Sequence, residues 1–268
     1  MRLLAVAAAA LGSILIVGSG LLTPFPVHPD AMAYHGAAER LLAGAPLYPH
    51  TMPDDPLAYR YAPWFAYVFI PFVWLGTLGM PLWYAFVTVG AVYVVFATFR
   101  LGGHAGLVLG LLALPIIGAI PGGNVGVLIV ALLIATRLHP AAVGLAASLK
   151  VYPILLVAGY VAERRWRDAA IAVGVAAVLW APALLFDLSG YITSPGAGGI
   201  SLFAIHPLLW VAQDAILIAA VGWLAIRGSR WTWLAAAATV PLFPPRTFLA
   251  GTGYFTAAAQ RITRLKRS

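Results

Sequence analysis

Residues 81–99 read PLWYAFVTVGAVYVVFATF and contain no charged side chain. At the 1.5 Å rise per residue of an α-helix, this run is roughly 28 Å long, close to the thickness of the hydrocarbon core of a bilayer. Apolar runs of similar length recur along the chain. The pattern therefore predicts a protein whose helices cross a membrane.

The composition excludes a soluble globular domain. Of the 268 residues 62% are apolar and 24 are charged (16 Lys and Arg, 8 Asp and Glu), whereas about a quarter of a soluble domain is charged. The chain has no cysteine, so a disulfide, a thiolate metal site and a cysteine nucleophile are also excluded.

Apolar runs between charged residues predict ten helices. Their ranges are 2–22, 62–79, 81–99, 103–120, 124–138, 140–162, 169–188, 207–226, 231–244 and 247–260. We therefore expect an all-α polytopic membrane protein of about eight to ten transmembrane helices in one domain, residues 1–268. A cleaved signal peptide is the alternative for 2–22, although no A-x-A site follows it.

The basic residues predict the orientation of these spans. With a cytoplasmic N-terminus, ten of them face the cytoplasm, namely Arg2, Arg164, Arg165, Arg167, Arg227, Arg230, Arg261, Arg264, Lys266 and Arg267. Five face outward: Arg40, Arg60, Arg100, Arg137 and Arg246. The positive-inside rule favours this orientation, with both termini cytoplasmic in the cell membrane, so the net charge of +8 does not indicate nucleic-acid binding.

Two long connections, residues 23–61 and 189–206, fall on the outer side. The cytoplasmic connections are too short for a nucleotide-binding domain, and the chain has no P-loop. Within the first outer loop, the stretch from Asp30 to Ala43 predicts an interfacial amphipathic helix that ends before Gly44.

Asp30 is the strongest candidate for a catalytic base, because a carboxylate just outside the bilayer can meet both a polar acceptor and a lipid-borne donor. Its structural alternative is an N-cap for the interfacial helix. Asp54 and Asp55 lie between Pro53 and Pro56, a pattern that is typical of a solvated turn. A metal ion bound by Asp30 and this pair is a minor alternative without specific ligand spacing.

Lys150 lies inside the predicted span 140–162, ten residues after Pro140 and thirteen before Glu163. A cation at that depth costs at least about 2.5 to 3.5 kcal/mol, which favours a functional role. The alternatives are a structural ion pair with Asp187 or Glu163, and a long snorkel to the interface.

Three further polar residues stand at membrane boundaries. Arg60 lies between Tyr59 and Tyr61, where it could bind a phosphate through two hydrogen bonds or anchor the chain at the membrane interface. Asn124 follows Pro121-Gly122-Gly123 and would line a cavity or form a plain turn. His206 closes the second outer loop, where it could meet a phosphate or sugar.

Several ordered motifs resemble those of family 87 glycosyltransferases over about residues 1 to 210. They are Asp30-x-x-x-Tyr34, Gly44-x-x-Leu47-Tyr48, Tyr59-Arg60-Tyr61-x-Pro63, Gly123-Asn124, Gly144-Leu145-Ala146 and Leu149-Lys150-Val151-Tyr152-Pro153. The resemblance implies a GT-C-like fold, a polyprenyl phosphate sugar donor, most often mannose, inversion at the anomeric carbon, and Asp30 as the base.

Physical reasoning agrees with that implication. An outer site has no nucleotide sugars, so the sugar would arrive on a lipid, and the acceptor would be a lipid or glycan. Phosphate is a good leaving group once its charge is stabilised, so one base suffices without a metal or other cofactor. Arg60, Lys150 and Arg246 are the candidates to bind the phosphate, and Tyr34, Tyr59, Tyr61, Asn124, Tyr152 and His206 to line the site.

Two other functions remain open. A small transporter or lipid flippase would use Lys150 as a midplane substrate site. A non-catalytic subunit of a glycosyltransferase complex would bind a stable partner, and loss of Asp30 would leave its function intact.

Overall fold

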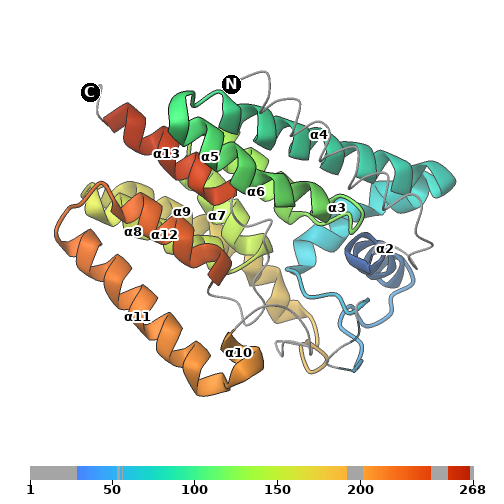
Figure 1. The fold of residues 1–268 in the computed structure, drawn as a ribbon. Coiled ribbons are helices and arrows are strands. Elements are labelled where there is room, and N and C mark those ends of the chain that lie inside the picture. Colours follow the sequence, from blue (N-terminus) through green and yellow to red (C-terminus); the bar gives the residue numbers. More distant parts are fainter. Residues whose placement is uncertain (1–28, 53–54, 56, 192–201, 243–252, 266–268) are drawn as a thin grey trace.

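The computed structural model describes residues 29–52, 55, 57–191, 202–242 and 253–265, and within them the chain forms helices and no strand (Figure 1). The helices are α2 (Pro29–Leu42), α3 (Pro63–Trp74), α4 (Gly79–Phe99), α5 (Gly103–Ala113), α6 (Gly126–Ala135), α7 (Pro140–Leu149), α8 (Val157–Ala162), α9 (Trp166–Trp180), α10 (Leu202–Ile205), α11 (Pro207–Ile226), α12 (Thr232–Leu242) and α13 (Tyr254–Leu265). Short 3-10 turns are η1 (Gly76–Leu78), η2 (Leu114–Ala119), η3 (Tyr152–Leu156) and η4 (Ala181–Leu185). The predicted first span 2–22, Asp54 and Arg246 lie outside the described residues.

Three apolar helices in the described part of the chain are long enough to cross a membrane: Gly76–Phe99, Trp166–Leu185 and Pro207–Ile226, with 24, 20 and 20 residues. They match the predicted spans 81–99, 169–188 and 207–226. Their exposed side chains are largely apolar, as expected of surfaces that face lipid. The other apolar helices are shorter, between 10 and 17 residues.

The predicted interfacial helix is α2. It buries Tyr34, Ala37 and Ala38 against the bundle and leaves Glu39 exposed, but Leu42, which also belongs to the predicted apolar face, is exposed. The predicted division into an apolar and a polar face is therefore confirmed in part. By contrast, the predicted apolar span 247–260 differs from α13, which begins at Tyr254. Helix α13 buries Ala257, Ala258 and Ile262 but carries Arg261 and Arg264, so it packs one face on the bundle.

The prediction of one helix over residues 140–162 is wrong, because the chain turns back at Lys150. Helix α7 ends at Leu149, and Lys150 has extended backbone angles (φ −134°, ψ 117°). Pro153 follows in η3 and offers no N–H to a continuing helix. The Tyr160 hydroxyl donates a hydrogen bond to the Leu138 carbonyl. Residues before α7 and at the end of α8 therefore meet, and α7–α8 is a helical hairpin with Lys150 at its tip.

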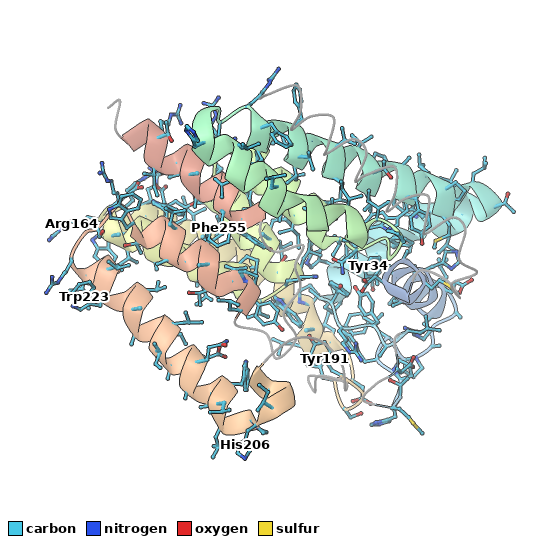
Figure 2. The ribbon with its side chains drawn as sticks, in the orientation of Figure 1. Tyr34, Arg164, Tyr191, His206, Trp223 and Phe255 are labelled. Atoms are coloured by element: carbon cyan, nitrogen blue, oxygen red, sulfur yellow. The ribbon has the colours of Figure 1, made fainter. Side chains whose placement is uncertain are left out.

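This hairpin changes which connections share an end of the bundle. Arg100, Arg137 and Arg264 line one cavity, and Arg261 pairs with Glu163 after α8. The prediction that Arg100 and Arg137 face away from the other arginines is therefore wrong. We call the shared end the arginine end; Figure 2 labels Arg164 there, far from Tyr34 and Tyr191. Its arginines are Arg100, Arg137, Arg164, Arg165, Arg167, Arg227, Arg230, Arg261 and Arg264. Among the described residues, Arg40 belongs to α2 and Arg60 to the loop before α3, and α2 and α3 lie at the other end (Figure 1).

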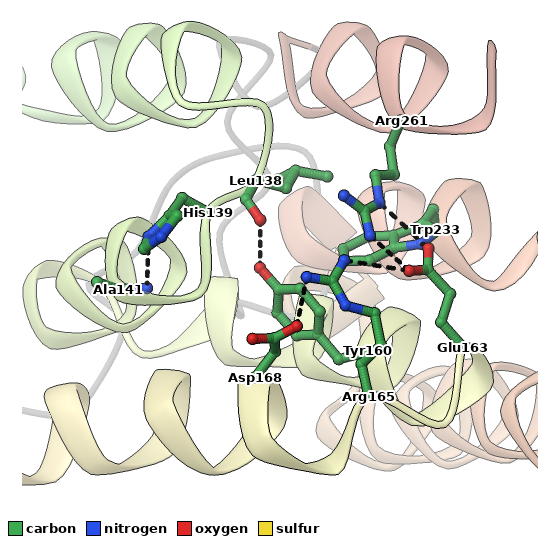
Figure 3. Close-up of polar contacts among 9 residues, drawn as sticks. All are labelled: Leu138, His139, Ala141, Tyr160, Glu163, Arg165, Asp168, Trp233 and Arg261. Atoms are coloured by element: carbon green, nitrogen blue, oxygen red, sulfur yellow. Dashed lines mark hydrogen bonds and ion pairs between the residues drawn. The ribbon is translucent and has the colours of Figure 1, made fainter. Parts of the chain in front are cut away.

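A partly buried polar cluster joins α8, α9, α12 and α13 at the arginine end (Figure 3). Glu163 accepts hydrogen bonds from Trp233 Nε1 at 2.6 Å and Arg261 Nε at 3.2 Å. The Glu163 and Arg261 side chains are only 13% and 12% exposed. Arg165 adds ion pairs with Glu163 and Asp168. The cluster satisfies the charge of Glu163 and fixes α13 against the hairpin.

A glycine allows the hairpin to approach α9 closely. A Cβ on Gly144 would lie 2.4 Å from the Ala172 carbonyl oxygen and 2.7 Å from Val175 Cβ. Small residues at such crossings let membrane helices pack backbone to backbone. The hairpin is therefore held at its α7 arm by contact with a candidate membrane span.

We expect Gly144→Ala to lower the free energy of unfolding by about 1–3 kcal/mol, because the new methyl group overlaps the backbone of α9. The measurement is thermal unfolding of the purified protein in detergent. The matched control is Gly174→Ala on α9, whose Cβ would meet nothing within 4 Å. Equal stability of the two variants would contradict the close packing of α7 on α9.

The hairpin also predicts a labelling pattern, which is simple to measure because the chain has no cysteine. Single cysteines are introduced at three exposed positions, one in each variant: His104→Cys, Arg167→Cys and Ser189→Cys. We expect a membrane-impermeant maleimide to reach the first two from one side of sealed vesicles and the third from the other. If 140–162 were a single span, His104→Cys would instead label together with Ser189→Cys.

Candidate active site

Three of the residues singled out in the sequence form one hydrogen-bonded chain. Asn124 Nδ2 donates to Asp30 Oδ2 at 2.8 Å, and Lys150 Nζ donates to Asn124 Oδ1 at 3.1 Å. They come from the start of α2, the turn before α6 and the tip of the α7–α8 hairpin. The fold thus brings a carboxylate and an ammonium group to the two sides of one amide.

The position of Asp30 is set by the start of α2. The helix begins at Pro29, so Asp30 lies within the first turn and not at the N-cap position, contrary to the structural alternative. The adjacent Ala31 N–H donates to the Gly122 carbonyl at 3.1 Å. A carboxylate in a first turn is favoured by the helix dipole, and here it faces the turn that carries Asn124.

That turn requires glycine. Gly123 has φ +61°, and a Cβ there would lie 2.6 Å from Ala31 Cβ, so a larger residue would push α2 away. Trp83 Nε1 of α4 donates to the Gly123 carbonyl at 2.8 Å. The turn is therefore clamped between α2 and α4, which fixes the distance from Asn124 to Asp30.

The contacts of Asn124 determine how its amide is oriented. Its Oδ1 also accepts from the Gly126 N–H at 2.7 Å, at the start of α6. Lysine can only donate and a carboxylate only accepts, so exchanging the amide oxygen and nitrogen would break the hydrogen bonds on both sides. Asn124 is thereby held as a bridge between Asp30 and Lys150.

The two ion-pair partners considered for Lys150 are engaged elsewhere. Glu163 binds Arg261 at the arginine end, and Asp187 is exposed and accepts from the Ser189 N–H at 2.9 Å. Lys150 instead points to Asn124. Its position at the hairpin tip, with an α7 arm of ten residues or about 15 Å behind it, places the ammonium deep in the bundle.

The predicted site tyrosines pack beneath Asp30. Tyr34 donates to the Tyr61 hydroxyl at 3.0 Å, and the Tyr34 hydroxyl oxygen accepts from the Val125 N–H at 3.3 Å. Tyr59 donates to the Ala62 carbonyl at 2.8 Å. Tyr34, Tyr59 and Tyr61 are only 0%, 3% and 8% exposed. In this structure the three side chains form a packed support of the site, and their predicted role in lining it for a substrate stays a prediction.

The electrostatic setting keeps these phenols protonated. Burial, and next the Asp30 carboxylate, raises the pKa of Tyr61 well above its ordinary value, while Arg60 acts in the lowering direction. Burial likewise raises the pKa of Tyr191 to about 12. These hydroxyls therefore remain hydrogen-bond donors over the physiological pH range.

Arg60 is held in place by its own loop and by Tyr191. Its Nη2 donates to the Asp55 carbonyl at 3.1 Å, and the Tyr191 hydroxyl donates to the Arg60 carbonyl at 3.3 Å. Tyr191 follows η4, so the contact joins the loop before α3 to the connection after α9. Arg60 is thus positioned by backbone contacts with the loop before α3 and with the connection after α9.

Two other predicted residues take no part in the two hydrogen bonds of the Asp30–Asn124–Lys150 chain. His206 is exposed and caps α11, since its Nδ1 accepts from the Leu208 N–H at 3.2 Å. Tyr152 is half-buried in η3, near Asp214 of α11. Among the described residues no three His, Asp or Glu side chains gather as a metal ion would require; Asp54, part of the metal alternative, lies outside them.

Sequence reasoning missed three residues of this region. Trp83 fixes the Gly123 turn, and Tyr84 lies close enough to Asp30 for an electrostatic interaction. Asp214 is a buried carboxylate, 7% exposed, in an apolar helix. Only Asp214 carried a signal in the sequence, as the single acidic residue in the predicted span 207–226.

Comparisons with known proteins add no relative. No protein-family model matches the chain, and neither the curated proteins nor the solved structures gave a significant match.

Proposed function

We propose that this chain is an integral-membrane glycosyltransferase with a GT-C-like bundle. It would transfer a sugar, most simply mannose, from a polyprenyl phosphate to a lipid or glycan acceptor. The observation that carries the proposal is the Asp30–Asn124–Lys150 chain, which joins a candidate base to a candidate phosphate-binding cation. The motif resemblance points to the same residues independently of their contacts.

The charge distribution supports an outer site. By the positive-inside rule the arginine end faces the cytoplasm. From Arg137 back to Asn124, α6 and its flanks extend about 20 Å at 1.5 Å per residue, so the site lies in the outer half of a hydrocarbon core about 30 Å thick. A lipid-borne donor reaches that depth by lateral diffusion, whereas a nucleotide sugar does not.

The proposed reaction is a single displacement. Asp30 takes the proton of the acceptor hydroxyl, through the carboxylate oxygen that Asn124 does not contact, as the acceptor oxygen attacks the anomeric carbon. The bond from that carbon to the phosphate oxygen breaks, and its electron pair leaves with the lipid phosphate. Lys150 and Arg60 stabilise the departing charge. A single displacement inverts the configuration of the anomeric carbon. Asn124 would keep the Asp30 and Lys150 side chains at a fixed distance from each other through its two hydrogen bonds.

The direct test is transfer of labelled mannose from polyprenyl phosphate mannose to endogenous lipids and glycans in isolated membranes. We expect membranes that carry the chain to form labelled product above matched membranes that lack it. Other polyprenyl phosphate sugars form the second arm. No transfer from any of them would reject the proposal.

A second candidate is a lipid or solute transporter, which the break at Lys150 favours. Interrupted helices with a charged residue at the break often mark transport sites. Sugar-lipid movement across vesicles that contain the purified chain, with no covalent transfer, would support this function over the first.

A further inference from the structure

A second charged site lies at the arginine end, away from Asp30. It is a cavity of about 840 Å³ between the ends of α4, α6 and α13. Three arginines, Arg100, Arg137 and Arg264, line it together with the neutral polar side chains of Gln260 and Thr263. The rest of its wall is apolar or aromatic and includes Tyr93, Phe96 and Ile134.

The charge of this cavity is not balanced by its walls, since none of the described residues that line it is acidic. The ion pairs of the described residues at this end use Arg165 and Arg261 with Glu163 and Asp168. The Arg100 guanidinium instead lies 4.4 Å from the centre of the Phe96 ring. Three guanidinium groups around one cavity match an anion with several acceptor oxygens, which is the chemistry of a phosphate group.

The surroundings favour a phosphate that belongs to a lipid. Val89, Val92 and Phe96 form an exposed stripe along α4, with 68%, 63% and 54% of their surface accessible. The stripe belongs to the candidate membrane span Gly76–Phe99 and ends at the cavity. An acyl chain can cover this stripe while the headgroup occupies the cavity, at the depth where headgroups lie. A free phosphate would leave the stripe without a partner.

We propose that Arg100, Arg137 and Arg264 form a binding site for the headgroup of an anionic phospholipid, with Phe96 packed between headgroup and acyl chain. The site is independent of the proposed sugar transfer, because it lies at the other end of the bundle from Asp30. It would hold the ends of α4, α6 and α13 together around one shared anion.

The test is binding of fluorescent short-chain phosphatidylglycerol to the purified full-length chain in neutral detergent. We expect Arg100→Gln/Arg137→Gln to weaken binding about 25-fold, on the basis of about fivefold for each of the two charges lost. The matched control is Arg227→Gln/Arg230→Gln, which removes two exposed arginines at the same end that do not line the cavity. The control is expected to bind like the wild type.

Three results would overturn the proposal: an equal loss in both variants, equal binding of zwitterionic phosphatidylcholine, or displacement of the lipid by millimolar inorganic phosphate. The last would assign the cavity to a free anion. A measurement on the wild type avoids any folding defect. Photo-crosslinking with a phosphatidylglycerol analogue should label peptides from α4 and α13, and labelling confined to other helices would contradict the site.

Discussion

Replacing Asp30 by Asn should reduce sugar transfer by about 10²- to 10⁴-fold, the range for losing a general base. The amide has nearly the shape of the carboxylate but cannot take the acceptor proton. Its oxygen can still accept from Asn124 Nδ2, so the bond that holds the turn is retained. The effect should therefore appear in kcat, measured as labelled mannose transferred per minute at matched expression.

The control for this substitution is Glu39→Gln on the same helix. Glu39 is exposed and contacts His35. Its substitution by glutamine therefore removes one negative charge from α2 without affecting Asn124. Transfer by Glu39→Gln should match the wild type. If Asp30→Asn retains full activity in that comparison, Asp30 is not the base.

Replacing Lys150 by Met should lower transfer by about 10²- to 10³-fold, the range for removing one group that stabilises developing charge. Methionine keeps much of the side-chain length and lacks the ammonium group that would meet the departing phosphate. Because this charge develops as the bond breaks, we expect the loss in kcat, with a smaller change in KM. Initial rates over a range of donor concentrations separate the two.

The control variant is Lys150→Arg, and thermal unfolding of each variant measures how much of the protein is folded. Arginine keeps the charge, so Lys150→Arg should be more active than Lys150→Met. A merely structural lysine would give a different outcome: the two variants would be equally active once corrected for the amount of folded protein.

Local patterns predicted the parts of this protein better than their arrangement. Asp30, Asn124 and Lys150 were each singled out by residue type and position, and the structure joins them. The sidedness of Arg100 and Arg137 was not predictable from apolar length alone, because residues 140–162 have the length of one span. Pro153 was the local signal of a break, but a proline is also tolerated in many membrane helices.

The roles of the tyrosines were hard to predict for a different reason. Aromatic residues at a membrane boundary look alike in sequence whether they face lipid, substrate or the core. Tyr34 is buried because α3 and α4 surround it with aromatic side chains. The centres of the Phe65, Phe69 and Trp83 rings lie 4.9 to 5.8 Å from the centre of the Tyr34 ring. That packing depends on long-range contacts, which periodicity does not reveal.

Because Lys150 lies at the tip of the α7–α8 hairpin, we expect the candidate site to form late in the folding of the protein. Neither arm of α7–α8 is long enough to cross a bilayer, and backbone that turns at membrane depth is stable only when protein surrounds it. The tip can settle only after α6 and α9 are in place to receive it. We therefore expect the contact between Lys150 and Asn124 to form only after α9 has been synthesised and inserted.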